Sequence, residues 1–207
     1  ELATHLHDVH VPSVAHTWLK RWLIGAVAKV YEAEQNPMLV LDGNQGIGKS
    51  EFARYLCSGL SKFYIESGID PNNNDHKIWL MQSWLWEVAE LGATTSKSDV
   101  EALKAFITMR EVTVRPPYGH YALQKPALAS FIGTVNDDGS GIFRDTTGNR
   151  RFLTLELSKI DWRYTQLNIH SLWAQAVALY RSGYDWRLKV DEKQQQRTIC
   201  RRDGASR

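Results

Sequence analysis

An α/β fold with a largely parallel sheet is predicted by helical and strand patterns that alternate along the 207 residues. A glycine-rich turn between a short apolar strand and an amphipathic helix, within residues 39–56, indicates the same fold class. A chain with 43% hydrophobic residues can bury one substantial core, so one domain is the default. We therefore expect three layers, with helices on both faces of the sheet.

The individual elements follow from the spacing of apolar residues. Helices are predicted at Val14–Val30, after Lys49, after the capping box that Ser98 forms with Glu101, and at Leu172–Tyr180. Strands are predicted at Met38–Leu41, Trp84–Val88, Ala127–Val135 and Phe152–Leu157. The stretches Glu111–Arg115 and Tyr121–Lys125 flank a proline-rich turn and predict an inserted β-hairpin.

The two ends of the chain differ from the body in composition. Residues 1–13 contain three histidines without the spacing or further ligands of a metal site, and we expect a linker or docking segment there. Residues 14–186 form the predicted domain. Residues 187–207 hold seven of the 25 Lys and Arg residues against three acids, and we expect a basic tail that leads into further chain.

Composition also bounds the cellular setting. The sequence has no apolar run long enough to span a bilayer, so no membrane partner is expected. Its two cysteines, Cys57 and Cys200, do not make a disulfide framework. A reduced, cytoplasmic location is the simpler inference.

The strongest motif is Gly43–Ser50, GNQGIGKS, which fits the phosphate-loop pattern G-x-x-x-x-G-K-[ST]. Glycines let backbone N–H groups converge on a triphosphate, and the following helix directs its positive end at the same phosphates. Lys49 would reach the β- and γ-phosphates, while the Ser50 hydroxyl would be a ligand of Mg²⁺. The candidate nucleotide-binding residues are Gly43, Asn44, Gln45, Gly46, Ile47, Gly48, Lys49, Ser50 and Glu51.

A triphosphatase also needs acids that hold Mg²⁺ and activate water. Glu87 and Glu90 stand at or beyond the end of a predicted buried strand, where ligands bind in open α/β sheets. Glu87 is the candidate metal ligand together with Ser50. The alternative for Glu90 is that it caps a helix or pairs with a lysine.

Three further polar residues complete the candidate catalytic set. Asn136 closes another predicted strand and could orient the attacking water, although an ordinary turn asparagine is the alternative. Of the adjacent Arg150 and Arg151, one could project to a neighbouring subunit as an arginine finger.

These residues together resemble the virulence-associated E family of phage- and plasmid-type ATPases, related to superfamily 3 helicases. The resemblance runs from about Trp18 to Trp186 and rests on the blocks GNQGIGKS, WLWEVAEL, KAFITMR, VRPPYG, FIGTVN and DTTGNRRF. It implies an AAA+-like fold, ATP hydrolysis with Mg²⁺, hexameric rings and single-stranded or forked DNA as partner. It also implies a fused or associated primase.

The resemblance assigns roles to single residues as well. Glu87 and Glu90 stand where the Walker B acids are expected, Asn136 resembles sensor 1, and Arg150 or Arg151 resembles the arginine finger. The hairpin stands where related helicases contact DNA, and its candidate contacts are Arg115, Tyr118, His120 and Lys125, with Tyr121 as a second stacking residue. A structural hairpin whose tyrosines pack internally is the alternative.

An ATP-driven DNA helicase or translocase motor domain is thus the leading hypothesis. One alternative is a non-hydrolysing, nucleotide-gated module for DNA binding or assembly. The other is a small-molecule kinase that uses the same phosphate loop.

Overall fold

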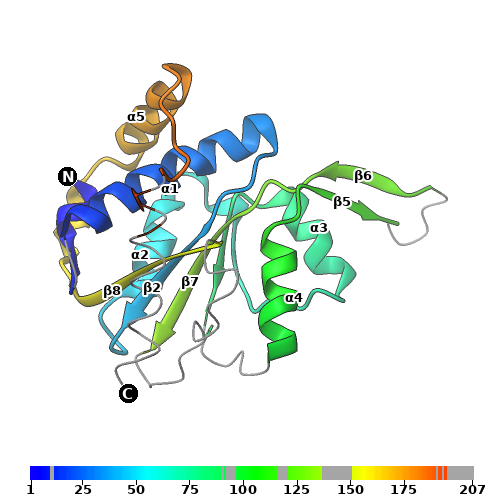
Figure 1. Cartoon of the computed structure of the whole chain (residues 1–207), viewed down its shortest axis with the longest axis horizontal. Helices are drawn as coiled ribbons and strands as arrows, with labels where there is room; N and C mark the ends of the chain where they lie inside the picture. Colours follow the sequence, from blue (N-terminus) through cyan, green and yellow to red (C-terminus); the bar gives the residue numbers. More distant parts are fainter. Residues whose placement is uncertain are drawn as a thin grey trace.

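The computed structural model describes residues 1–9, 12–89, 91, 97–115, 121–136, 151–189, 191–192 and 194. Among these residues, six strands form one sheet in the order β1-β8-β2-β7-β4-β3 (Figure 1). Neighbouring strands run parallel except β1, which pairs antiparallel with β8 at one edge. The strands are β1 (Leu6–Asp8), β2 (Met38–Gly43), β3 (Tyr64–Glu66), β4 (Leu85–Val88), β7 (Ser130–Asn136) and β8 (Phe152–Ile160).

Helices cover both faces of this sheet, which confirms the predicted three-layer α/β architecture (Figure 1). The α-helices are α1 (Pro12–Glu32), α2 (Lys49–Leu56), α3 (Asn74–Gln82), α4 (Lys97–Ile107) and α5 (Ile169–Arg181). Short 3₁₀ helices are η1 (Leu2–His5), η2 (Ser58–Phe63) and η5 (Trp162–Gln166). The helix predicted after Ser98 starts at Lys97, and the Ser98 side chain lies outside what the structure describes.

The alternation of side chains along β2 separates two cores. Leu39 and Leu41 pack with α1, α2 and α5 on one face of the sheet. Met38 and Val40 pack with α3 and α4 on the other. Because β2 is buried on both faces, its sequence is a continuous apolar run.

A two-stranded antiparallel sheet extends away from this body, as predicted for the inserted hairpin (Figure 1). Its strands are β5 (Glu111–Val114) and β6 (Leu123–Pro126). Val112 and Val114 of β5 are buried in the α3–α4 core, whereas all four residues of β6 are exposed. The hairpin is therefore attached to the body through β5 and presents β6 to solvent.

Of the linker or docking segment expected at residues 1–13, the described residues 1–9 dock on the body instead of forming a free linker. Leu2 and Leu6 are buried in the core, and Leu6 pairs with Ile160 of β8. A strand of three residues is too short to show a period-2 pattern, and His5 and His7 give the segment a polar composition. The sequence therefore carried no strand signal here.

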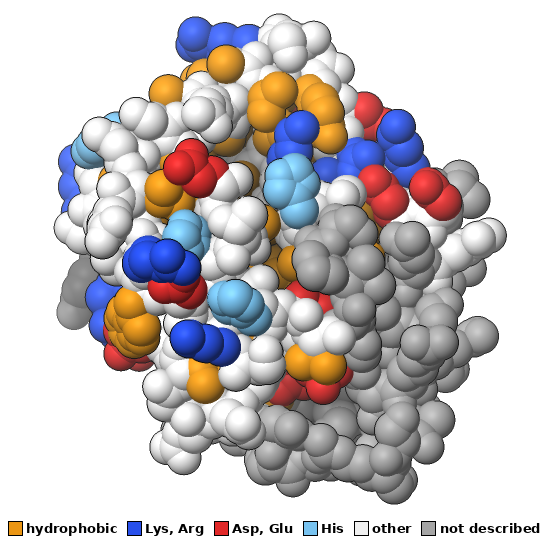
Figure 2. All heavy atoms as spheres, turned by 90° about the vertical axis from the view of Figure 1, so that its left-hand side faces the viewer, with side chains coloured by type: hydrophobic (Ala, Val, Ile, Leu, Met, Phe, Trp, Pro, Cys, Tyr) orange, Lys and Arg blue, Asp and Glu red, His pale blue; other side chains and the backbone are white. Residues whose placement is uncertain are grey.

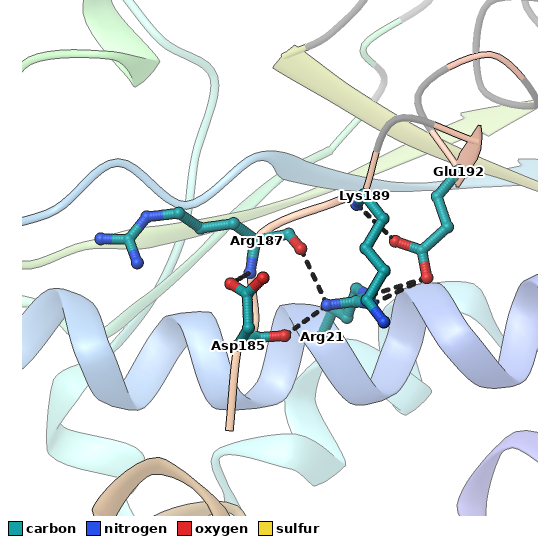
Figure 3. Close-up of polar contacts among 5 residues, drawn as sticks. All are labelled: Arg21, Asp185, Arg187, Lys189 and Glu192. Carbon is teal, nitrogen blue, oxygen red and sulfur yellow. Dashed lines mark hydrogen bonds and ion pairs between the residues drawn. The ribbon is translucent and has the colours of Figure 1, made fainter. Parts of the chain in front are cut away.

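The start of the expected basic tail is likewise held against the body. Arg21 of α1, which is 4% exposed, donates to the backbone carbonyls of Asp185 and Arg187 (Figure 3). Its Nη2 also lies 2.8 Å from Oε1 of Glu192, and Oε2 of the same carboxylate accepts from the backbone N–H of Lys189. One buried guanidinium thus links Asp185, Arg187 and Glu192 to α1. Within the described part of the chain, no helix has the length and apolar character needed to cross a membrane.

Candidate nucleotide-binding site

The phosphate loop connects the carboxyl end of β2 to the start of α2, as the motif predicts. Gly46 and Gly48 have φ values of 83° and 95°, in the left-handed region that favours glycine. At Gly43, a Cβ atom would lie 2.3 Å from the carbonyl oxygen of Leu157. Gly48 is the N-cap of α2 and provides no side chain to cap it, so the N–H groups of the first helical turn are available to an anion.

Lys49 lies inside this loop and is only 6% exposed. Its Nζ donates to the carbonyl oxygens of Gly43 at 2.7 Å and Asn44 at 2.8 Å, and to the Oδ1 of Asn136 at 3.1 Å. Burial lowers the pKa of the amine from its usual value, and the nearby charge of Asp42 opposes that shift. Two carbonyl oxygens of the loop and the amide oxygen at the end of β7 thus hold the lysine amine where a phosphate would arrive.

Asn136 reaches Lys49 because of the strand order. It is the last residue of β7, and the parallel register places it opposite Gly43 at the end of β2. The sequence predicted an amide beside the loop, and the only basis was that Asn136 closes a predicted strand. The structure brings that amide into contact with the lysine of the loop.

Glu87 is fully buried in β4, and its Oε2 accepts a hydrogen bond from the hydroxyl of Tyr64. Burial, followed by the bond to Glu87, raises the pKa of Tyr64. The register places Glu87 opposite Ile132, four residues before Asn136 on β7. At roughly 3.3 Å per residue, Glu87 is therefore about 13 Å from Asn136 along the strand direction, toward the amino ends of the strands. Coordination of Mg²⁺ by Glu87 and Ser50 together stays a prediction.

Arg151 directly precedes β8, and the next residue, Phe152, lies opposite Met38 at the start of β2. Arg151 thus lies at the amino ends of the parallel strands, whereas the phosphate loop lies at their carboxyl ends. The length of β2 separates the two ends by roughly 17 Å. Four other candidates, Glu90, Tyr118, His120 and Arg150, lie outside the described residues.

The described DNA candidates of the hairpin, Arg115 and Lys125, are both exposed. Tyr121 is 87% exposed, so internal packing does not hold for this tyrosine. On the face toward the left of Figure 1, by contrast, described basic and acidic side chains lie next to one another instead of gathering by sign (Figure 2). The exposed hairpin residues thus remain candidates for nucleic-acid contact, which stays a prediction.

Two aromatic residues beside the loop were missed by the sequence reasoning. Trp162 lies against Gly48, where a Cβ atom would be 2.8 Å from its Cζ2. Tyr164 packs edge-to-face on Phe52 and Tyr55 of α2. The available signal was their position just beyond the carboxyl end of β8, a strand parallel to β2.

Solved structures of the NrS-1 C-terminal region are among those that match this chain. An apo structure of that region has a TM-score of 0.49 and 16% identity and covers 97% of this chain and 54% of that chain. The A form apo structure has a TM-score of 0.47 and 15% identity, with 99% and 54% covered. This chain therefore spans about half the length of those chains.

None of the curated proteins matches the sequence. A family model does: that of the virulence-associated protein E-like domain matches residues 1–203. This match extends over nearly the whole chain and confirms the resemblance seen in the motifs. The chain belongs to the virulence-associated protein E-like family.

Proposed function

We propose that this chain is the ATP-hydrolysing motor domain of a DNA helicase or translocase that acts in replication of a mobile element. The observation that carries the proposal is the contact between Lys49 and Asn136 at the shared edge of β2 and β7. It joins a phosphate-binding loop to a polar residue that can sense or position what binds there. The same edge of a parallel sheet is where ligands bind in open α/β folds.

The loop fits a triphosphate with Mg²⁺. The backbone at Gly43 leaves no room for a side chain, and the Lys49 amine already occupies an oxygen-lined site that phosphate oxygens can share. Ser50 of the first helical turn would hold Mg²⁺ with phosphate oxygens and water, because this ion needs few protein ligands. Bound Mg²⁺ would neutralise the charge that develops on the transferred phosphoryl group.

We assign activation of water to Glu90 rather than Glu87. The β4–β7 register places Glu87 below the strand ends that carry the loop, and its carboxylate accepts a hydrogen bond from Tyr64. Glu90 follows three residues later in the chain. We therefore expect Glu90→Gln to abolish turnover and Glu87→Gln to retain part of it. The reverse result would return the role to Glu87.

We assign the arginine finger to Arg151 or Arg150, acting on the loop of a neighbouring subunit in a ring. Arg151 lies at the sheet edge opposite to the loop, so it cannot serve its own site. Two variants test this point: Arg151→Ala and Lys49→Ala subunits, each inactive alone, should regain activity when they are mixed. Mixtures that stay inactive at every ratio, for Arg150→Ala as well, would contradict a shared site.

The deciding experiment measures ATP hydrolysis across protein concentration, with and without single-stranded DNA. Turnover that rises steeply with both, and is lost in Lys49→Ala, supports the ring motor. Lys62→Ala is the matched control, because Lys62 is an exposed lysine that lies over the ring of Phe63. Turnover that is linear in protein and independent of DNA would favour a small-molecule kinase.

The non-hydrolysing module is the second candidate function. It is favoured by the engagement of Glu87 with Tyr64, which occupies one of the two candidate Walker B acids. It predicts tight ATP binding that depends on Lys49, no turnover at any protein concentration, and no effect of Glu90→Gln.

A further inference from the structure

An exposed tryptophan lies beside the phosphate loop and takes no part in phosphate binding or hydrolysis as proposed. Trp162 begins η5, two residues after β8 ends at the loop edge of the sheet. The ring edge faces Gly48: a Cβ atom there would lie 2.8 Å from Cζ2 and 3.2 Å from Cη2. Yet 51% of Trp162 is exposed, and it is the one exposed tryptophan of the described chain.

The ring is held by a packed support. Trp162 stacks on Tyr164, with ring centroids 6.0 Å apart and planes 25° from parallel. Tyr164 is itself 1% exposed and packs edge-to-face on Phe52, at 5.2 Å between centroids. The flat side chain is therefore positioned before any ligand arrives.

Hydrogen bonds of the backbone and of side chains fix the turn that carries the ring. The Asp161 carboxylate accepts from the backbone N–H of Arg163 at 3.1 Å and from its Nε at 2.7 Å. The Asp161 N–H donates to the carbonyl of His5, and the Thr165 hydroxyl donates to the carbonyl of Trp162. These bonds tie η5 to itself and to the N-terminal segment.

We propose that Trp162 forms the base-binding wall of the nucleotide site and stacks on a purine base. The inference rests on the proposed nucleotide binding at the loop. A phosphate loop recognises only the phosphates, so the base needs its own contact nearby. An aromatic face offers it, because stacking grows with the area of the base and thus favours purines over pyrimidines.

The test compares ATP, CTP and inorganic tripolyphosphate, each with Mg²⁺, by calorimetric titration of the whole chain. We expect Trp162→Ala to weaken ATP binding by about 5- to 100-fold and to leave tripolyphosphate binding unchanged. Trp162→Phe, which keeps an aromatic face, should retain most of the ATP affinity. The preference for ATP over CTP should be lost in Trp162→Ala.

Fluorescence gives an independent readout. ATP, but not tripolyphosphate, should quench tryptophan emission in the wild type and in Trp79→Phe, whose changed residue belongs to α3 on the other face of the sheet. The quenching should be absent in Trp162→Phe. A quench that persists in Trp162→Phe would overturn the assignment.

The outcomes separate this inference from the proposed function. Equal weakening of ATP and tripolyphosphate in Trp162→Ala would mean that the ring only supports Gly48, and would overturn base stacking. Unchanged affinities for both would do the same. If neither ligand binds the wild type in a Lys49-dependent way, the nucleotide site itself fails, and the base wall fails with it.

Discussion

The Lys49 amine donates to the Oδ1 of Asn136 at 3.1 Å, across the ends of two adjacent parallel strands. The two residues are 87 positions apart in the chain, and only the β2–β7 pairing brings them together. A γ-phosphate that draws Lys49 toward itself would release or reorient the Asn136 amide. The contact therefore couples the state of the phosphate loop to the end of β7.

Substitution of Asn136 should separate binding from turnover. In Asn136→Ala, Lys49 keeps its two carbonyl partners in the loop, so we expect ATP affinity to change little. Loss of the positioning amide should lower kcat by about 100-fold. Titration with ATP and steady-state hydrolysis measure the two effects. Equal losses in ATP affinity and in kcat/KM would show that Asn136 contributes to ATP binding and not to the chemical step.

The Tyr64–Glu87 hydrogen bond should contribute to stability. Tyr64→Phe removes the donor and leaves a fully buried carboxyl group without it, which should lower the free energy of unfolding by about 1–3 kcal/mol. Tyr31→Phe is the control, because Tyr31 is 61% exposed. Urea denaturation of both variants checks the prediction. Equal stability of the two variants would show that the Tyr64 hydroxyl contributes nothing to the free energy of unfolding.

The fold and the core of the site could be predicted from sequence because the signals were local. The strand, loop and helix around Lys49 are contiguous, and the buried strand before Asn136 is an apolar run. The depth of Glu87 in the sheet could not be predicted, since it depends on the register of β4 against β7. Trp162 was missed for the same reason: its contact with Gly48 joins two segments that only the β2–β8 pairing brings together.

The hairpin should account for part of the DNA affinity. If Arg115 and Lys125 contact phosphates, each alanine variant should weaken binding across all sequences. The slope of log affinity against log salt should fall by about 0.7 per lost contact on single strands. Lys159→Ala is the control, because Lys159 is exposed on β8, away from the hairpin. Fluorescence anisotropy at several salt concentrations gives the slopes, and equal slopes in all variants would exclude these contacts.

Arg21 should hold the segment after α5 in place. Arg21→Lys keeps the charge but cannot present the several donors that reach Asp185, Arg187 and Glu192 together. We expect faster hydrogen exchange in residues 185–192, with unchanged exchange in β2. Lys20→Arg is the control on the same helix. Unchanged exchange in residues 185–192 of Arg21→Lys would show that other contacts hold the segment.

Lys29 should make stability depend on alkaline pH. Its amine is fully buried with no hydrogen-bond partner among the described residues, 5.7 Å from the ring centroid of Phe131. Burial lowers its pKa from 10.5 to about 8. Between these values the unfolded chain binds the proton that the folded chain has released, so the free energy of unfolding rises with pH, by about 3 kcal/mol in total.

The Lys29→Met variant isolates this contribution, because other groups titrate equally in both proteins. Methionine places a neutral chain of similar length in the same apolar site, so we expect the variant to be more stable than the wild type at pH 7. Its advantage should shrink as pH rises from about 8 to 10.5 and stay constant above that, where the wild-type amine is neutral in both states. Urea denaturation at a series of pH values gives the difference directly. A difference that stays constant with pH would mean that Lys29 keeps an ordinary pKa through water or a partner that reaches its amine.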